Sequence, residues 1–486
     1  MIPVKNIIDH LDAIQILGPT DLHVNLAHTD SRKIVENDVF IAVKGSTVNG
    51  HDFIAKAIEL GSSVIVCEDL PATISENICY IQVLNSSLAA GACNKVCYGN
   101  PDEQLKLIGI TGTNGKTTIA TLLFNLFKNL GFGVGLISTV ENRINENIIP
   151  STHTTPEVSE LYKLINAMVE DGVDYCFMEV SSHAISQHRI AGLQFDAALF
   201  SNLSHDHLDY HKTFAEYRDT KKQLFDQLSP EAFALVNKDD KNSLYMVQNT
   251  KATRYSYAQK SIGDFTSKIL EADFNGMQID LNGNQFWTPL VGGFNAINLT
   301  AVYGTAVLFD IPTDQLIVEL SKLGRVKGRF ELINPGHPNP IIIDYAHTPD
   351  ALENVIDTIN SIRKNSAGLT VVFGCGGDRD ITKRPKMGAV AASKANRVIL
   401  TNDNPRTEDP GKILKDIENG IEGQHFKKVL QIADREQAIK TAITTAGSGE
   451  VILIAGKGHE TYQEINGVRH DFDDSEVAHK IIESIS

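Results

Sequence analysis

The chain has 486 residues, of which 42% are hydrophobic and 21% charged, and its formal net charge is −16. This length exceeds what one ordinary hydrophobic core covers and predicts about three domains, and the composition excludes a largely disordered chain. The acidic balance argues against a general nucleic-acid-binding protein, although a local basic pocket could still bind an anionic small molecule.

The cysteines and the apolar runs narrow the protein class further. The six cysteines are scattered without C-x-x-C spacing, which disfavours a zinc site and a disulfide framework. The stretch Met1–His10 lacks the basic start and long apolar segment of a signal peptide, and no run reaches the ~18 apolar residues of a membrane span. We therefore expect a cytoplasmic protein.

The first 103 residues alternate strand-like runs with helical stretches. The strand-like runs are 39–43, 63–67 and 80–83, and the helical stretches are 53–60 and 88–96. The Asn100-Pro101 pair is a turn signal and marks the end of this region. The pattern predicts a small α/β domain over residues 1–103.

The most specific signal is a glycine-rich turn between an apolar run and an amphipathic helix. Residues 108–118 read Ile-Gly-Ile-Thr-Gly-Thr-Asn-Gly-Lys-Thr-Thr. Backbone N–H groups of 112–115 would bind phosphate oxygens, Lys116 would neutralise the β- and γ-phosphates, and the Thr117 hydroxyl would bind Mg²⁺. The strict P-loop pattern has glycine where Ile110 stands, so the alternative is a turn that binds no nucleotide. The expected strand, the Gly-Lys-Thr sequence and the expected helix follow one another in the order of a P-loop, which favours the nucleotide-binding interpretation.

Residues 104–328 continue the alternation and predict a mostly parallel sheet with helices on both faces. The expected strands are 105–111, 133–138, 175–180, 197–202 and 232–237, and residues 251–290 form a β-rich insertion. Ligands of such sheets bind at the carboxyl ends of the strands.

Three polar features follow these strands. Glu179 ends a strand and could bind Mg²⁺, with a capping or solvent-facing role as the alternative. Residues 201–211 are rich in His and Asp, for which surface polarity or a disfavoured zinc site are the alternatives. Lys221 and Lys222 lie on a helix expected over 214–228, and residue chemistry alone gives them no function.

A third α/β unit begins near Phe330, after a linker at 324–328 that would let it move as a rigid body. Its expected strands are 340–344, 370–373, 398–401 and 451–454, and each runs into a polar loop. Four such loops predict a second ligand-binding site, at the carboxyl ends of the strands of this sheet. Arg379 and Arg406 lie on two of these loops and could bind a carboxylate or phosphate by paired hydrogen bonds.

Together these segments resemble the Mur ligases of peptidoglycan synthesis, in the family's order, from about Asp30 to Gln463. The matching motifs are Thr111–Thr118, Glu179–His183, Asn202–His211, Gly293–Asn298, Gly328–Glu331, Asp344–Pro349, Gly376–Asp380 and Asp403–Arg406. The resemblance implies an α/β protein of three domains: a small N-terminal UDP-binding domain (1–103), a central P-loop ATPase with a mostly parallel sheet (104–328) and a C-terminal Rossmann-like domain that binds the amino acid (329–486).

The resemblance also implies the reaction. The D-Glu γ-carboxylate of UDP-N-acetylmuramoyl-L-Ala-D-Glu attacks ATP to give an acyl phosphate, and an amine then displaces phosphate; Mg²⁺ is the expected metal. The four-residue loop 403–406 marks the members that add meso-diaminopimelate, whose distal carboxylate Arg406 and Arg379 could pair with. The L-lysine-adding members are the alternative. We expect a monomer without a nucleic-acid partner.

The site residues that the resemblance implies fall into four groups. Those expected to bind ATP are Gly112, Thr113, Asn114, Gly115, Lys116, Thr117, Thr118, Asn298 and Asp344. Those expected to bind the UDP-muramoyl dipeptide are Thr29, Ser31, Ser46, Thr47, Val48, Thr154, Thr155, Ser181, Gln187 and Arg189. Those expected to bind diaminopimelate are Arg379, Asp403, Asn404, Pro405, Arg406, Gly456 and Glu460. The metal is expected near Thr117, Glu179, His207 and Lys221.

Lys116, His207 and Lys221 are the implied catalytic residues. The family carries the lysine that matches Lys221 as N6-carboxylysine, and this modification supplies a carboxylate for Mg²⁺, which an ammonium group cannot do.

Three other classes would share part of this pattern. A P-loop kinase would not need the second ligand-binding site, and a folylpolyglutamate synthase would need neither the 403–406 loop nor a UDP-binding domain. A nucleotide switch protein would not need a carboxylated Lys221.

Overall fold

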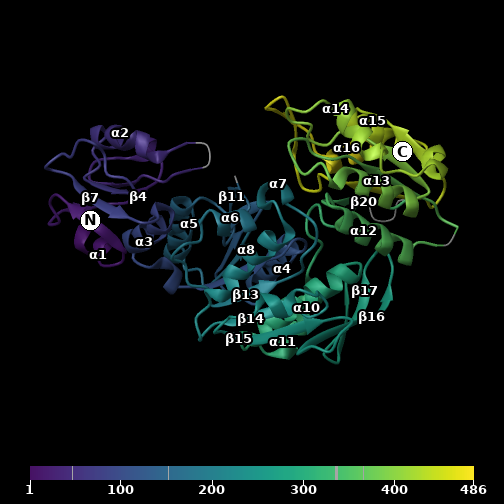
Figure 1. The fold of residues 1–486 in the computed structure, drawn as a ribbon. Helices are drawn as coiled ribbons and strands as arrows, with labels where there is room; N and C mark the ends of the chain where they lie inside the picture. The colour runs from purple at the N-terminus through teal and green to yellow at the C-terminus, as the bar shows by residue number, and fades with distance from the viewer. Residues whose placement is uncertain (46–47, 152, 334–337, 365, 486) are drawn as a thin grey trace.

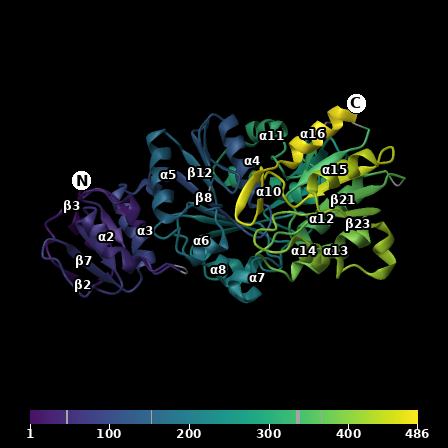
Figure 2. The ribbon, with the colours of Figure 1, turned by 90° about the horizontal axis from the view of Figure 1, so that it is seen from above.

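The computed structural model describes residues 1–45, 48–151, 153–333, 338–364 and 366–485. The chain forms three α/β lobes in a row, with the N-terminal lobe at one end and the C-terminal lobe at the other (Figures 1 and 2). This confirms the predicted α/β fold class. Within the described residues, no helix is long and apolar enough to cross a lipid bilayer.

The N-terminal lobe is built on a sheet with the strand order β2-β7-β6-β5-β4, in which β2 alone runs antiparallel to its neighbour. Its strands β5 and β6 are apolar and fully buried because helices and loops cover both faces. The elements are β1 (Ile2–Pro3), α1 (Val4–Ile8), β2 (Ala13–Leu17), β3 (His23–Val24), β4 (Ala27–His28), β5 (Val39–Ile41), α2 (Ile54–Glu59), β6 (Val64–Cys67), β7 (Cys79–Val83) and α3 (Ser86–Cys97).

The central lobe holds a large sheet with the order β11-β10-β9-β12-β8-β13-β14-β15-β16-β17-β18. Its middle, from β9 to β16, is parallel, and antiparallel hairpins extend both edges. The strands are β8 (Lys106–Thr111), β9 (Val134–Ile137), β10 (Glu141–Ile144), β11 (Asn147–Pro150), β12 (Tyr175–Glu179), β13 (Ala197–Phe200), β14 (Phe233–Asn237), β15 (Thr253–Ala258), β16 (Phe265–Ala272), β17 (Met277–Leu281) and β18 (Asn284–Thr288).

Helices cover the two faces of this sheet and form separate cores. One core joins α4, α10 and α11 to the sheet, and the other joins α5, α6, α8 and α9. The helices are α4 (Lys116–Asn129), α5 (Val158–Glu170), α6 (Ser182–Ser186), α7 (Leu208–His211), α8 (Phe214–Asp226), α9 (Ser243–Met246), α10 (Gly293–Leu308) and α11 (Thr313–Lys322).

The C-terminal lobe has the sheet order β19-β20-β24-β21-β22-β23, parallel except for β19. Helices α12, α13 and α14 cover one face, and α15 and α16 cover the other. The elements are β19 (Glu331–Ile333), β20 (Ile341–Asp344), α12 (Pro349–Ile362), β21 (Leu369–Phe373), α13 (Lys383–Lys394), β22 (Arg397–Leu400), α14 (Pro410–Glu418), β23 (Val429–Gln431), α15 (Arg435–Thr444), β24 (Val451–Ala455), β25 (Tyr462–Ile465), β26 (Val468–Asp471) and α16 (Asp474–Ile485).

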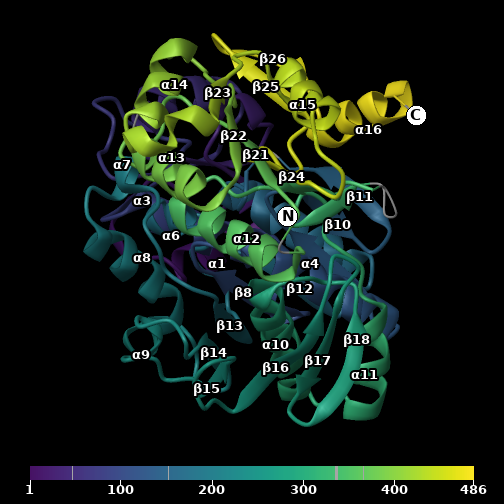
Figure 3. The same ribbon diagram turned by 90° about the vertical axis from the view of Figure 1, so that its right-hand side faces the viewer.

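The C-terminal lobe lies over the central lobe, as Figure 3 shows from the side. Residues at the carboxyl ends of β20, β21, β22 and β24 line the space between the two lobes, opposite residues that follow β8, β12 and β13. The two sheet edges at which we predicted ligand binding therefore face each other across one cleft. The predicted buried strands agree with the observed ones to within about two residues, and the hairpins β10–β11 and β25–β26 were not predicted.

Candidate functional site

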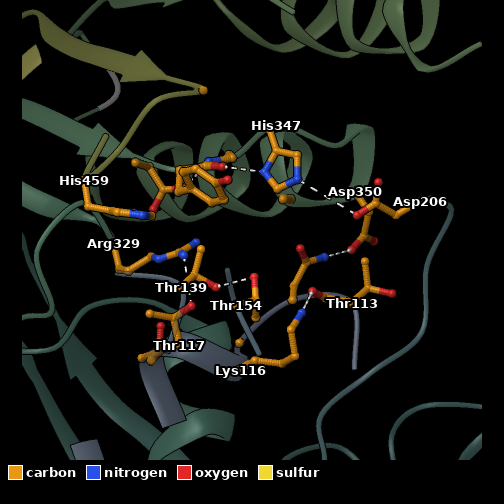
Figure 4. A pocket seen from close by; sticks show the side chains of 18 of the residues that line it. Thr113, Lys116, Thr117, Thr139, Thr154, Asp206, Arg329, His347, Asp350 and His459 are labelled. Atoms are coloured by element: carbon orange, nitrogen blue, oxygen red, sulfur yellow. Dashed lines mark hydrogen bonds and ion pairs between the residues drawn. The ribbon is translucent and has the colours of Figure 1, made fainter. Parts of the chain in front are cut away.

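The cleft between the central and C-terminal lobes has a volume of about 1470 Å³. Its walls come from segments that are far apart in the chain: the glycine-rich turn, the ends of central strands, the start of α10 and the strand-end loops of the C-terminal lobe. In Figure 4, Lys116 and Thr117 lie on one side of it, and His347 and His459 face them from the other. Such a cleft can bind two ligands side by side.

The glycine-rich turn curls around the ammonium of Lys116. Gly112 and Gly115 take positive φ values of 144° and 90°, so the backbone turns sharply between β8 and α4. The Lys116 Nζ donates to the carbonyl oxygens of Gly112 (3.0 Å) and Thr113 (2.8 Å). Burial lowers the pKa of Lys116, while the Glu179 and Asp206 carboxylates oppose that shift. The turn thus presents a buried cation beside backbone N–H groups at a helix N-terminus, which suits polyphosphate.

Two further residues expected at the nucleotide lie beside this turn. A Cβ on Gly115 would stand 2.7 Å from Asn298 Oδ1, so Asn298 packs directly on the glycine. Asp344 ends β20 and accepts hydrogen bonds from the backbone N–H groups of Phe330 (2.7 Å) and Ala346 (2.8 Å). Burial raises the pKa of Asp344 to about 6. Thr113 and Thr118 are buried, and both line the cleft with Asn114.

Arg329 is a site residue that the sequence reasoning did not single out. Its Nη2 donates to the Thr117 hydroxyl (3.1 Å), and its guanidinium lies 4.4 Å from the centre of the Tyr345 ring. The only sequence signal for it was its place in the 328–331 motif. The contact brings a second cation to the glycine-rich turn from the start of the C-terminal lobe.

Glu179 is held by a chain of hydroxyl groups. Its carboxylate accepts from the backbone N–H (2.9 Å) and the hydroxyl (3.2 Å) of Thr139, and the Thr139 and Thr154 hydroxyl oxygens lie within hydrogen-bond distance of each other (3.0 Å). Thr155 donates to the Glu179 backbone oxygen (2.8 Å). The expected metal ligand and two expected dipeptide contacts therefore belong to one network, which Thr139 joins as a residue that sequence reasoning missed.

His207 lies at the start of α7 with a positive φ of 55°. Its ring meets that of His183 edge-on at 4.9 Å, and its Nε2 is 3.4 Å from an Asp206 oxygen. Burial lowers the pKa of His207 to about 3, so the imidazole is neutral at pH 7 and has a lone pair to give to a metal. Within the described part of the chain, no three His, Cys, Asp or Glu side chains group closely enough to bind a metal by themselves.

The adjacent lysines of α8 have different surroundings. Lys221 is 1% exposed, and its Nζ donates to the Gly112 backbone oxygen (2.8 Å) and lies 4.8 Å from the Tyr217 ring centre. Burial and the nearby Lys116 charge lower the pKa of Lys221 well below its usual value. Lys222 instead pairs with both oxygens of Asp226, one turn along the helix. Only Lys221 reaches the glycine-rich turn.

The residues expected at the muramoyl dipeptide are divided between two lobes. Arg189 donates to the Thr155 backbone oxygen (3.0 Å) and to Gln187 Oε1 (2.6 Å), and it pairs with Glu157. Those that line the cleft are Thr154, Thr155, Ser181 and Arg189. Those in the N-terminal lobe, away from this cleft, are Thr29, Ser31 and Val48, whereas Ser46 and Thr47 lie outside the described residues.

The loop 403–406 forms the far end of the cleft. Arg406 has a positive φ of 50°, and its Nη1 donates to the Gly377 backbone oxygen (2.7 Å). Asn404 donates to Glu460 Oε2 (2.8 Å), so two expected substrate contacts are already joined. Those of the expected set that line the cleft are Arg379, Asp403, Asn404, Arg406, Gly456 and Glu460, while Pro405 is buried behind them.

Polar contacts join the central and C-terminal lobes across the cleft. His205 Nε2 lies 2.9 Å from Asp380 Oδ2, and Asn114 Nδ2 donates to Asp350 Oδ2 (3.2 Å). The sequence did not predict either pair, because each joins residues more than a hundred positions apart. A residue of the glycine-rich turn therefore touches the first turn of α12 directly.

Three family profiles match the chain: Mur ligase family, catalytic domain (residues 23–97), Mur ligase middle domain (110–306) and Mur ligase, glutamate ligase domain (328–458). The chain is 47% identical over 483 residues to UDP-N-acetylmuramoyl-L-alanyl-D-glutamate--2,6-diaminopimelate ligase of Cytophaga hutchinsonii, with 99% of both chains covered. It is 46% identical to the enzyme of the same name from Bacteroides fragilis, covering 98% of this chain and 99% of that one.

The fold is similar to solved structures over almost its full length. A structure of UDP-N-acetylmuramoyl-L-alanyl-D-glutamate--2,6-diaminopimelate ligase is 32% identical, with a TM-score of 0.69 and 97% of both chains covered. MurF ligase from Thermotoga maritima, solved with ADP, is 20% identical with a TM-score of 0.64, covering 95% of this chain and 99% of that chain, and supports the fold alone. From the profile matches and the identity to these relatives, the chain belongs to the Mur ligase family.

Proposed function

We propose that this chain is the ATP-dependent ligase that adds meso-2,6-diaminopimelate to the D-Glu γ-carboxylate of UDP-N-acetylmuramoyl-L-Ala-D-Glu. The observation that carries the proposal is one cleft with a phosphate-binding turn at one end and the Asp403–Arg406 loop at the other. The relatives with 47% and 46% identity are named for this reaction.

The central lobe supplies most of the residues for the first step, in which ATP activates the substrate carboxylate. The turn 112–115 and Lys116 hold the ATP phosphates, and Arg329 adds charge from the opposite lobe. Neutralising these oxygens lets the substrate carboxylate, itself an anion, approach the γ-phosphorus. The carboxylate oxygen forms the new P–O bond and ADP leaves, which gives the acyl phosphate that the amine then attacks.

The residues near the turn fit a bound Mg²⁺. The Thr117 hydroxyl and the Glu179 carboxylate are oxygen donors, and the neutral His207 ring offers a nitrogen. Because these groups are too few to bind a metal alone, the nucleotide phosphates and a modified Lys221 would complete the set. Bound Mg²⁺ would screen the phosphate charge.

Lys221 fits conversion to N6-carboxylysine. Burial lowers the pKa of Lys221, which raises the share of neutral amine, and a neutral amine adds to CO₂ with loss of one proton. The resulting carbamate would replace a buried cation beside Lys116 with an anion. That exchange removes a like-charge contact and supplies oxygen donors at the metal.

The choice of amino acid belongs to the C-terminal lobe. Diaminopimelate carries a distal carboxylate that lysine lacks, and the guanidinium groups of Arg406 and Arg379 line that end of the cleft. Glu460 supplies an anion for the distal ammonium. Lysine has no distal carboxylate to pair with Arg406 and Arg379, so L-lysine is the disfavoured substrate.

We assign the lobes to three functional domains: residues 1–103 to the UDP group, 104–328 to ATP and 329–486 to the amino acid. All of the proposed groups come from one chain, and we propose that the monomer is active.

An amino-acid panel tests the proposal. Purified protein with ATP, Mg²⁺ and UDP-N-acetylmuramoyl-L-Ala-D-Glu is given meso-diaminopimelate, L-lysine or no amino acid, and phosphate release and product mass are measured. We expect product with diaminopimelate only. Phosphate release without an amino acid, or equal turnover with lysine, would contradict it.

A further inference from the structure

Lys457 lies behind the far end of the cleft and belongs to none of the groups assigned above. It is 0% exposed and lies in the loop between β24 and β25. Its Nζ donates to Asn404 Oδ1 (3.1 Å) and to Glu460 Oε2 (3.1 Å). One buried ammonium therefore touches two residues expected to meet the amino-acid substrate.

The contacts of Lys457 fix how the Asn404 amide is turned. Asn404 Oδ1 accepts from the Lys457 ammonium and from the backbone N–H of Glu464 (3.0 Å). Its Nδ2 donates to Glu460 Oε2 (2.8 Å). A flipped amide would point N–H groups at two donors, so the observed orientation is the one that satisfies every partner.

The same contacts fix the Glu460 carboxylate. Oε2 accepts from both Lys457 and Asn404, whereas Oε1 makes no hydrogen bond within the described residues. Glu460 lines the cleft, and so its Oε1 is the oxygen left for a ligand. A carboxylate with one oxygen held and one free is suited to receive an ammonium group.

Lys457 also offsets the negative charges of the buried Glu460 and Asp403 carboxylates. Burial and the neighbouring Asp403 carboxylate raise the pKa of Glu460, and the Lys457 ammonium opposes that rise. The other buried cation nearby, Arg435, is committed to both oxygens of Asp474 at 2.7 Å. Lys457 is thus the cation that touches Glu460 itself.

Building on the proposed function, we propose that Lys457 is a positioning residue for the amino-acid substrate. Its ammonium holds the Asn404 amide and the Glu460 carboxylate in the arrangement that receives the distal ammonium group of the diamino acid. Lys457 acts through these two side chains and does not contact the substrate.

The test compares Lys457→Met and Lys457→Gln with the wild-type enzyme. Methionine keeps the length without the charge, and glutamine keeps one donor. We expect the KM for diaminopimelate to rise about thirtyfold in Lys457→Met and less in Lys457→Gln, while the KM values for ATP and the UDP-muramoyl dipeptide stay within about twofold. Lys394→Met is the matched control, because Lys394 pairs with Glu353 and Asp357 in the same lobe, outside this loop cluster.

A double-mutant cycle separates positioning from a general loss of structure. If Lys457 acts through Glu460, then Lys457→Gln in a Glu460→Gln background should change the KM for diaminopimelate far less than in the wild type. The proposal is overturned by an unchanged KM for diaminopimelate, by additive effects in the cycle, or by equal rises in all three KM values with a lower Tm. Failure of the proposed function would appear separately, as a wild-type enzyme that does not use diaminopimelate.

Discussion

At the scale of single residues, Lys221 and Lys222 differ in chemistry although they are neighbours on α8. Lys221 donates to the Gly112 backbone oxygen, and Lys222 pairs with Asp226. Periodicity could not separate them, since both are buried. The resemblance to the family pointed to Lys221, and the contacts supply a physical reason for that choice.

Lys221→Ala should lower kcat by about two orders of magnitude or more, because the site loses the proposed lysine carboxylate that would bind Mg²⁺. Added formate or acetate should restore part of the activity by supplying a carboxylate. Steady-state assays with and without each anion measure this. Lys222→Ala, which removes the pair with Asp226 and the contact with the Tyr245 ring, is the control and should keep most of its activity. Full activity of Lys221→Ala in plain buffer would refute the assignment.

We expect the buried His459 to make the stability of the protein depend on pH. Burial lowers its pKa to about 3, whereas an unfolded histidine titrates near 6.5. Between these values the unfolded chain binds a proton that the folded protein does not, so the free energy of unfolding falls as the pH drops through this window. His459→Gln should therefore show a smaller loss of Tm than the wild type between about pH 7 and about pH 5. Exposed His479→Gln is the control, and equal losses in the two variants would contradict the prediction.

At the scale of elements, the residues that turn the chain into and out of α4 can be compared directly. Gly115 precedes the helix with φ 90°, and Gly131 follows it with φ 93°. A Cβ on Gly115 would meet Asn298 Oδ1 at 2.7 Å, whereas a Cβ on Gly131 would meet nothing within 4 Å. An alanine at either end of α4 would therefore suffer similar backbone strain. Only at position 115 would its side chain also collide with Asn298.

Gly115→Ala and Gly131→Ala should each destabilise the protein by about 1 kcal/mol, because alanine disfavours positive φ. Only Gly115→Ala should also weaken ATP binding, since it displaces Asn298 from the phosphate-binding turn. Thermal unfolding and calorimetric titration with ATP distinguish the two effects. Equal ATP affinity in the two variants would show that the packing of Asn298 on the turn does not matter for the nucleotide.

The elements also show what a sequence can and cannot predict. Runs such as Val451–Ala455 are apolar throughout because their strands are buried on both faces, and that pattern identified the parallel sheets. The hairpins β10–β11 and β25–β26 mix polar and apolar residues, and most residues of β11 and β26 are exposed, which leaves no clear periodicity. Lys457 was not predicted because its contacts with Asn404 and Glu460 depend on how two loops pack together.

At the scale of the whole molecule, the active arrangement depends on how two lobes meet. Arg329 reaches Thr117, Asn114 reaches Asp350, and His205 reaches Asp380. No local pattern encodes these pairs, since each needs the final placement of the lobes. The pairs connect residues in and near the glycine-rich turn with the lobe proposed to bind the amino acid, so we expect nucleotide binding and lobe closure to be coupled through them.

Removing two of these contacts should open the molecule. In His205→Ala/Asp350→Ala, the loss of the interlobe hydrogen bonds of these two side chains, about 2 kcal/mol in total, would shift the closed-to-open ratio about thirtyfold. We expect a larger radius of gyration in small-angle scattering and a lower kcat, with a Tm close to that of the wild type because the core of each lobe is intact. Glu353→Ala/Lys394→Ala, which breaks an ion pair within the C-terminal lobe, should change neither the radius nor kcat. If the first double variant has the same radius and kcat as the wild type, the interlobe pairs do not hold the cleft closed, and its geometry must come from the linker that ends at Gly328.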